Sequence, residues 1–424
     1  MKRDVVKSDL QPLMVSTSDI RGGAARATFR LHQGLRALGV GSYLLAFRRL
    51  SGDSAVVRVP GKLALQRVKF STWADRYPLS LYPRRDKHHH WSVNLTPNGI
   101  AEQINYLNPS LVHLHWVGDG FVPIGALKHI NVPILWTLHD MWTFTGGCHY
   151  TGGCEGYQTR CGHCPQLKSN MTFDLSRVIM RSKEKHWRGL NLTVITPSRW
   201  LAECVKASSL LHQARVEVIP NGLDLEKYKP LDKATARHML GLPQDKHLIL
   251  FGALQSLTDT RKGAHHLHRA LAQLAQTHHE STEVVIFGAP KPPHPPDFGL
   301  KAHYLGTLYD DLSLAMMYAA ADVFVAPSVQ DNLPNTVMEA LACGTVCVAF
   351  NIGGMPDMIS HCENGYLATP FEADDLAQGV RWLLEDDARR AHMGQRARRD
   401  VEARFELGVI ARRHVDLYQE VLHS

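Results

Sequence analysis

Cysteine is scarce in this chain, with eight residues among 424, and four of the eight fall within residues 143–167. Long hydrophobic runs are also lacking, and the longest, such as residues 341–350, are far too short to span a bilayer. The first residues include basic side chains but no continuous apolar segment of the kind found in secretory signals. These absences predict a cytoplasmic protein in which thiols stay reduced.

The excess of positive charge is modest, because the 47 Lys and Arg residues outnumber the 40 Asp and Glu residues only enough to leave a formal net charge of +7. An excess of this size favours anionic partners, such as nucleotide phosphates or an acidic membrane surface. The basic residues are dispersed, and no RNA- or DNA-binding signature is found. We therefore expect no nucleic-acid partner.

What the chain does contain is a long alternation of short β-branched runs and amphipathic segments. Strands are predicted at residues 12–17, 111–116, 134–139, 192–197, 216–220, 248–253, 283–288, 303–306, 322–327 and 346–350, and helices at 23–38, 262–276, 311–321 and 335–343. This alternation predicts an α/β protein with parallel sheets. Because the strands form two sets, we expect two doubly wound domains facing across a cleft, at residues 1–215 and 216–405. A C-terminal helix at 406–424 is expected to pack back on the first domain.

Six segments, in this order, resemble family 4 glycosyltransferases: RGGAAR at 21–26, TLHD at 137–140, TPSRWL at 196–201, PNGLD at 220–224, FGA and RKG within 251–263, and PSVQDNLPNTVMEALACGT at 327–345. Each motif alone is weak, but the six are collinear and cover nearly the whole chain. The resemblance implies the GT-B fold, with two Rossmann-like domains, and sugar transfer from a nucleotide-sugar with retention of anomeric configuration. It is closest to the branch that builds bacterial exopolysaccharide and lipopolysaccharide repeat units, the colanic-acid type included.

Arg261 and Lys262 stand just after a predicted strand and directly at the start of a predicted helix. Two cations at the positive end of a helix dipole can stabilise the charge that grows on a departing diphosphate. In the resembling family this Arg-Lys pair grips the diphosphate. The alternative is a solvated helix start with incidental basic residues, but the order of the motifs favours a phosphate site.

Gly22 and Gly23 follow the first predicted strand and open the first helix. Glycine lets a backbone approach a phosphate closely, and a helix N-terminus favours the anion. The resemblance places this loop over the donor phosphates. The spacing is not GxGxxG, which counts against an ordinary nicotinamide or flavin site. A second glycine-rich loop, NIGGMP at 351–356, is as consistent with a purely structural turn as with a loop that contacts phosphate or sugar.

Asp331 and Glu339 lie eight residues apart in QDNLPNTVME. The family often carries two glutamates at this spacing, the first on the hydroxyls of the donor sugar and the second on the ribose. The resemblance therefore assigns Glu339 to the ribose, whereas the shorter Asp331 is expected to share the sugar contact with the backbone of Asn332 and Leu333. From the residues alone, an alternative for Glu339 is a first-turn glutamate favoured by the helix dipole, with Asn335 as the cap.

His139 ends the predicted strand ILWTLH. A lone histidine is more often a satisfied structural residue, but the resemblance puts it in contact with the donor sugar, with Asp140 orienting its ring. No pair of carboxylates imposes hydrolase or double-displacement chemistry. The expected mechanism is a front-face substitution in which the leaving phosphate oxygen takes the acceptor proton. His139, Arg261, Lys262 and Asp331 form the expected catalytic set, which requires no cofactor.

Four cysteines occupy the glycine-rich loop 143–167 with the spacing C-x5-C-x6-C-x2-C: Cys148, Cys154, Cys161 and Cys164. Because a reduced compartment disfavours disulfides, the cluster suggests a structural zinc ion held by four thiolates. His149 and His163 are substitute ligands. The alternative is a loop whose small cysteines simply pack well, because C-x5-C is looser than the spacing in common zinc modules. We expect the zinc to brace the loop on the acceptor side and to take no part in sugar transfer.

Residues 62–91 mix basic and aromatic side chains, with Leu65, Val68 and Trp73 on one side of a predicted helix. Such a segment can lie on an anionic membrane surface, and enzymes of the resembling branch usually use lipid-linked acceptors. Packing against the first domain's own sheet is the alternative.

The predicted function is transfer of a hexose-type sugar from a UDP- or GDP-sugar to a growing, lipid-linked bacterial polysaccharide at the inner face of the cytoplasmic membrane. Two alternatives stay open. One is a sugar-nucleotide epimerase on the same fold, against which the order of RKG and DNLPNTVMEA argues. The other is a non-catalytic protein that binds a sugar nucleotide or polysaccharide, which the aspartate at position 331 makes conceivable.

Overall fold

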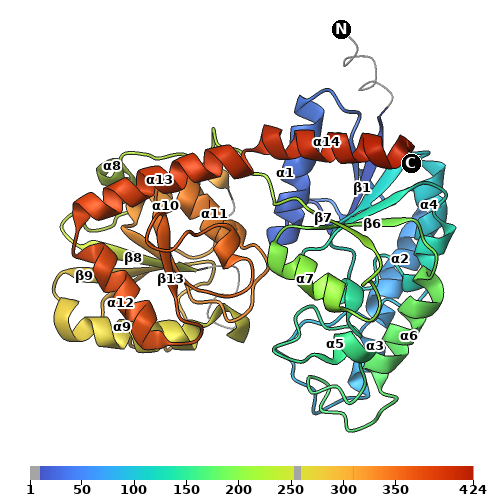
Figure 1. Cartoon of the computed structure of the whole chain (residues 1–424), viewed down its shortest axis with the longest axis horizontal. Helices are drawn as coiled ribbons and strands as arrows, with labels where there is room; N and C mark the ends of the chain where they lie inside the picture. Colours follow the sequence, from blue (N-terminus) through green and yellow to red (C-terminus); the bar gives the residue numbers. More distant parts are fainter. Residues whose placement is uncertain (1–9, 253–258, 309, 424) are drawn as a thin grey trace. The chain divides into compact units, whose positions relative to one another are not determined.

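The computed structural model describes residues 10–252, 259–308 and 310–423. Two compact units make up the chain (Figure 1): unit 1 comprises Met1–Gly222 and Gly408–Ser424, and unit 2 comprises Leu223–Leu407. No helix of the described ranges is long and apolar enough to cross a membrane. Ala253, predicted at the end of a strand and in the FGA motif, lies outside the described residues.

Unit 1 is built on a parallel sheet with the strand order β3-β2-β1-β4-β5-β6-β7. Its strands are β1 (Pro12–Ser18), β2 (Tyr43–Arg48), β3 (Val56–Arg58), β4 (Leu111–Leu114), β5 (Ile134–Thr137), β6 (Leu192–Thr196) and β7 (Arg215–Val218). The strands are almost continuously apolar because helices cover both faces of the sheet, as is usual for parallel sheets.

Alternate residues of the unit 1 strands pack on opposite faces. Met14 and Leu135 pack with α1 (Gly23–Ala37) and α14 (Leu407–His423), whereas Val15 and Trp136 pack with the elements on the other face. The other helices of this unit are α2 (Lys62–Ala74), α3 (Tyr77–Ser80), α4 (Ile100–Tyr106), α5 (Gly156–Thr159), α6 (Leu175–Trp187) and α7 (Arg199–Ala207), with short 3-10 turns at Ile124–His129 and Trp142–Phe144.

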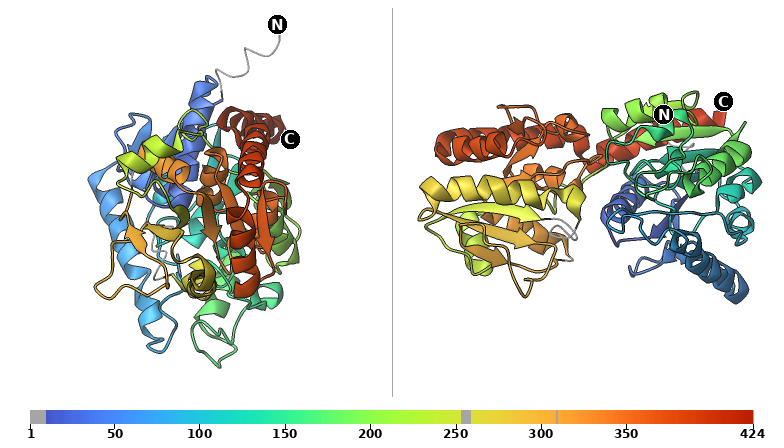
Figure 2. Two further views of the ribbon diagram at one scale, coloured as in Figure 1. Left: turned by 90° about the vertical axis from the view of Figure 1, so that its left-hand side faces the viewer. Right: turned by 90° about the horizontal axis from the view of Figure 1, so that it is seen from below.

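The C-terminal helix α14 lies beside α1 of unit 1 (Figure 1, Figure 2). Its apolar side, including Ile410, Ala411 and Tyr418, closes one face of the first sheet. The predicted return of the chain to the first domain is therefore confirmed, although only α14 returns. The preceding helix, α13 (Asp387–Phe405), packs with α11 in unit 2.

Unit 2 contains a parallel sheet with the order β10-β9-β8-β11-β12-β13. Its strands are β8 (His247–Gly252), β9 (Thr282–Phe287), β10 (Ala302–Tyr304), β11 (Val323–Ala326), β12 (Val346–Phe350) and β13 (Gly365–Ala368). Helices α8 (Lys233–Met239), α10 (Asp311–Ala320), α11 (Asn335–Ala342) and α13 cover one face, and α9 (Ala264–His278) and α12 (Ala373–Leu384) cover the other. Two 3-10 turns occur at Thr260–Lys262 and Met355–Asp357.

The predicted boundary at 215/216 differs from the one in the structure. Strand β7 crosses this position and pairs with β6, so the first unit continues to Gly222. The Pro-Asn-Gly turn after the strand separates the units, because it ends the last strand of the first sheet. Strands β2, β3 and β13 were not predicted from the sequence.

Candidate active site

A buried carboxylate and two cations meet at one end of the unit 2 sheet. Lys262 Nζ lies 2.6 Å from Asp331 Oδ2, and Arg261 Nη1 lies 3.3 Å from the same oxygen. Arg261 Nη1 also donates to the carbonyl of Gln330 at 3.0 Å, and Ser328 Oγ donates to Asp331 Oδ2 at 3.3 Å. The structure therefore brings together three of the predicted catalytic residues.

Burial and charge act in opposite directions within this cluster. Burial alone would raise the pKa of Asp331, but Lys262 and Arg261 outweigh it and hold the pKa of this carboxyl below its usual range. Burial lowers the pKa of Lys262, and Asp331 opposes that shift. The carboxylate is thus ionised near neutral pH, and both cations contact it in this structure, although Arg261 Nη2 also lies 3.2 Å from Asp259 Oδ2.

The backbone around this cluster is closely packed. Gly263, which follows Lys262 and begins α9, has φ +70°, and a Cβ there would lie 1.8 Å from the Pro327 carbonyl oxygen. Gly353 has φ +54°, and a Cβ there would lie 2.0 Å from the Asp331 carbonyl oxygen. Only glycine tolerates both the left-handed conformation and this proximity. The NIGGMP loop therefore serves at least as a structural turn against Asp331.

Glu339 is buried on α11, and Tyr318 Oη donates to its Oε2 at 3.0 Å. The first turn of α11 contains no acidic residue, and Glu339 lies beyond it. This position excludes the alternative in which Glu339 is a first-turn glutamate. The predicted cap is also wrong, because Pro334 holds the N-cap position without a side-chain hydrogen bond and Asn335 is already helical. Tyr318 was missed by the sequence analysis, since a tyrosine on a neighbouring helix gives no local signal.

Asn332 and Leu333 lie in the loop between Asp331 and α11, and both are buried. The Asn332 N–H donates to Asp331 Oδ1 at 3.1 Å, so this amide already holds the carboxylate. The predicted roles of both residues at the donor sugar stay predictions.

Gly22 and Gly23 lie in unit 1, where Gly22 is the N-cap of α1 with φ +98°. A Cβ on Gly22 would meet no atom of the described chain within 4 Å. The positive φ therefore accounts for this glycine, and the space beside its Cα is open. Space of this kind suits an approaching anion.

His139 also lies in unit 1, just after β5, where it is half-buried in a group with the buried His113 and His115. His115 Nδ1 lies 3.1 Å from His139 Nε2, with the two rings stacked at a centroid separation of 5.4 Å. His113 joins the group through a 4.2 Å ring contact with His115 and a 2.6 Å hydrogen bond to the Tyr418 hydroxyl. Burial lowers the pKa of His139 to about 4, against the opposing influence of Asp140, so its ring is neutral near pH 7.

Asp140 was predicted to orient the His139 ring, but its carboxylate is hydrogen-bonded to His149 and Trp116 instead. His149 Nδ1 lies 2.6 Å from Asp140 Oδ2, and Trp116 Nε1 donates to the same oxygen at 2.8 Å. The ring of His115 instead lies within hydrogen-bond distance of the His139 ring. The residues that contact His139 and Asp140 come from HLHW at 113–116, at the end of β4, which pairs with β5. This segment was not recognised because alternating histidines carry no motif.

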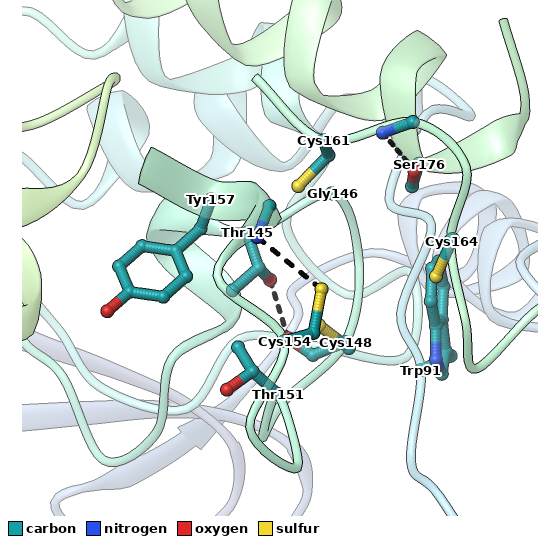
Figure 3. A pocket seen from close by; sticks show the side chains of 12 residues that line it. Trp91, Thr145, Gly146, Cys148, Thr151, Cys154, Tyr157, Cys161, Cys164 and Ser176 are labelled. Atoms are coloured by element: carbon teal, nitrogen blue, oxygen red, sulfur yellow. Dashed lines mark hydrogen bonds between the residues drawn. The ribbon is translucent and has the colours of Figure 1, made fainter. Parts of the chain in front are cut away.

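The four cysteines of loop 143–167 line one small cavity in unit 1 (Figure 3). His149 is held by Asp140 and Ser92, and His163 lies against Asn170 and Thr172. The two histidines proposed as substitute ligands are therefore engaged elsewhere. Among the described residues, no group of three or more His, Cys, Asp or Glu side chains is already placed as a metal ion would require.

Residues 21–227 match the family "Glycosyltransferase Family 4", and residues 232–400 match "Glycosyl transferases group 1". A relative from Methanocaldococcus jannaschii, the uncharacterized glycosyltransferase MJ1607, is 30% identical over 66% of this chain and 74% of its own length. The chain is a family 4 glycosyltransferase. D-inositol 3-phosphate glycosyltransferase 2 from Catenulispora acidiphila is 32% identical, over 50% of this chain and only 52% of that protein.

Solved structures with the same fold cover nearly all of this glycosyltransferase. Sucrose-phosphate synthase from Thermosynechococcus elongatus aligns with a TM-score of 0.69 at 19% identity, over 98% of this chain and 99% of that one. Anabaena Alr3699/HepE in complex with UDP and glucose aligns with a TM-score of 0.66 at 18% identity, over 97% and 100%. The predicted fold class, two Rossmann-like domains of the GT-B type, is thus confirmed.

Proposed function

We propose that this family 4 enzyme is a retaining hexosyltransferase that uses a UDP- or GDP-sugar. The group of Arg261, Lys262 and the buried Asp331 carries the proposal, because it places two partly exposed cations ahead of α9 on a carboxylate that a diphosphate can replace. Cations that are fixed in advance stabilise a leaving diphosphate at little cost of reorganisation. That one solved relative in fold holds UDP and glucose supports a donor of this type.

The donor is proposed to lie with its ribose at Glu339 and its sugar near Asp331, and the sugar contact that the resemblance implies for the neutral His139 of unit 1 stays a prediction. A neutral histidine can hydrogen-bond a sugar hydroxyl without competing for the diphosphate as a cation. Arg261 and Lys262 neutralise the charge on the departing diphosphate, and its oxygen takes the proton from the acceptor hydroxyl. The new glycosidic bond therefore forms on the face from which the diphosphate leaves.

The acceptor is proposed to be a lipid-linked saccharide of the exopolysaccharide or lipopolysaccharide type. Support comes from an exposed apolar stripe on α2 and α3. Its members, which are 58% to 73% exposed, are Leu63, Phe70, Trp73, Tyr77 and Leu81. Phe70 and Trp73 contact one another at a ring separation of 5.7 Å. Because exposed aromatic side chains grouped on one helix face are unusual in a soluble monomer, the stripe suits insertion among lipid headgroups.

This stripe differs from the face predicted from the sequence. Val68 is buried and Leu65 is half-buried against unit 1, so they anchor the helix, whereas Trp73 points to solvent. Lys62, Lys69 and Arg76 are exposed beside the stripe, at positions that helical geometry puts along one flank of it. Cations in that place favour an anionic surface. We propose that unit 1 docks on the inner face of the cytoplasmic membrane through this stripe.

Vesicle binding tests the docking surface. Wild-type protein should bind vesicles that contain anionic phospholipid, and added salt should weaken the binding because exposed charges are screened. The double variant F70S/W73S should lose most of it, whereas the control Tyr106→Ser, an 80% exposed aromatic on α4, should bind like wild type. Equal partitioning of wild type onto neutral and anionic vesicles would contradict the electrostatic part.

A panel of sugar nucleotides, supplied with lipid-linked and inositol-phosphate acceptors, tests the activity. Free nucleotide together with a glycosylated acceptor of unchanged anomeric configuration is the expected result. A new sugar nucleotide would indicate epimerisation, and saturable binding without turnover would indicate a binding protein. Glycosylation of only the inositol phosphate would redirect the acceptor proposal, since relatives with that activity match about half of this chain.

A further inference from the structure

The sulfur-lined cavity of loop 143–167 has the size of a single ion. Its volume is about 20 Å³, and it is lined by the four cysteines together with residues such as Trp91 and Tyr157. A cavity needs roughly 10–15 Å³ to hold one water-sized sphere. Figure 3 shows the sulfurs of Cys148, Cys154 and Cys161 gathered around the same space, with Cys164 approaching from the side of Trp91.

Backbone amides point at three of the sulfurs. The Gly156 N–H donates to Cys154 Sγ at 3.4 Å. The Gln166 and Leu167 amides point at Cys164, and the Gly146 amide points at Cys161. Burial raises the pKa of the Cys161 and Cys164 thiols, and the amides directed at their sulfurs oppose that shift by favouring the thiolate form. The two amides that follow Cys164 in the sequence order the turn directly after the C-x2-C pair.

A buried cation stands next to the cluster. Lys183 on α6 is completely buried, donates from Nζ to the carbonyl of Thr145 at 2.9 Å, and lies 3.9 Å from the centre of the Trp142 ring. Burial lowers the pKa of Lys183 to about 7, and Cys161 and Cys148, as thiolates, would oppose that shift and keep the amine charged. Arg177, beside Gly162, has a buried Nε without a hydrogen-bond partner in the described part of the chain. Buried positive charge of this kind calls for a nearby negative charge.

We propose that Cys148, Cys154, Cys161 and Cys164 bind one structural zinc ion as thiolates, with Lys183 as the buried counter-charge. Zinc with four thiolates carries two negative charges, which the neighbouring cations offset. Because the sulfurs do not yet surround one point at coordinating distance, binding requires the side chains to turn inward. Each thiol releases its proton when its sulfur binds the metal, so protons and zinc compete for the site.

This zinc would fix the loop that carries His149. His149 Nδ1 lies 2.6 Å from Asp140, and Asp140 follows His139 directly in the chain. The metal therefore acts at a distance from the sugar, by holding the segment next to the proposed donor contact. This inference does not depend on the proposed donor or acceptor.

Elemental analysis of the full-length, tag-free protein tests the site. We expect about one zinc per chain, lost in Cys161→Ser and Cys164→Ser. The matched controls Cys204→Ser and Cys362→Ser change cysteines outside the loop and should retain the zinc. Lys183→Met should weaken zinc retention against a competing chelator by about tenfold or more, because it leaves the anionic centre without its counter-charge.

Cobalt exchanged into the wild-type protein provides a readout that does not require any variant to fold. A thiolate-to-cobalt charge-transfer band is expected, together with the intense d–d absorption of tetrahedral cobalt. Absence of both zinc and this band, with all four thiols reacting in the folded protein, would overturn the proposal. Disulfides among these cysteines in protein purified under reducing conditions would overturn it equally.

Discussion

Lys262 and Asp331 form the closest ion pair in the unit 2 cluster, with 2.6 Å between Nζ and Oδ2 although 69 positions separate them in the chain. The pair joins the start of α9 to the loop ahead of α11. A diphosphate bound at the proposed site would therefore meet a cation that already has a partner, and Asp331 would share or release it. The strength of donor binding depends on how readily this exchange occurs.

Replacing Arg261 or Lys262 by alanine should lower kcat by roughly a hundredfold or more. Each cation is proposed to act on charge that grows as the nucleotide leaves, so its loss affects the transition state most. Steady-state kinetics with the donor found in the panel measure the effect. Lys301→Ala, which removes an exposed lysine from the same unit, should behave like wild type. Wild-type turnover in both site variants would move the diphosphate site elsewhere.

Glu339→Gln should raise the KM for the donor and leave kcat much closer to wild type, because the ribose barely changes during reaction. Tyr318→Phe removes the hydroxyl that donates to Glu339 Oε2 and should raise KM in the same direction by a smaller factor. A large loss of kcat in Glu339→Gln without a change in KM would place this carboxylate at the reacting sugar instead.

Gly263→Ala should lower the free energy of unfolding by about 2–4 kcal/mol, through left-handed strain together with overpacking against the Pro327 carbonyl. Gly241→Ala is the matched control, since it has φ +64° but no atom within 4 Å of the added Cβ. The free energy of unfolding of the control should fall only by the cost of the left-handed conformation, about 1–2 kcal/mol. Denaturant unfolding of the three proteins measures the difference, and equal losses would show that the contact with Pro327 relaxes.

Acid should destabilise the protein through its buried histidines. Burial lowers the pKa of His414 on α14 from 6.5 to about 4, so its folded state resists protonation more than the unfolded chain does. Its contribution is complete above pH 6.5 and is lost as pH falls towards 4, by about 3 kcal/mol at the end of this window. His414→Gln should therefore lose about 3 kcal/mol less stability than wild type between pH 7 and pH 4. His423→Gln, an exposed position on α14, should follow wild type throughout.

The alternation of strands and helices was sufficient to predict both sheets, because buried parallel strands produce short, nearly continuous apolar runs between helical segments. Strand β3 was missed because it has three residues, and β13 because the polar segment ahead of it resembles a loop. Strand β2, YLLAFR, is apolar enough to be recognised, but it stands between a glycine-rich turn and an arginine pair and was not assigned.

The motifs located the candidate site, but not the contacts within it. Arg261, Lys262 and Asp331 could be named from their order in the chain, whereas the ion pair between them depends on how two loops fold together. The same limit applies to His139, whose ring meets His115 from the neighbouring strand instead of the adjacent Asp140. Partners across strands leave no local sequence signal.

The position of helix α14 at the end of the chain determines when unit 1 can finish folding during synthesis. Unit 1 needs residues 408–424 to cover one face of its sheet, yet these are made only after all of unit 2. At ordinary rates of translation, the roughly 185 residues between take on the order of ten to forty seconds. During that interval Met14, Leu35 and their neighbours lack the helix that covers them, and the first domain begun is the last completed.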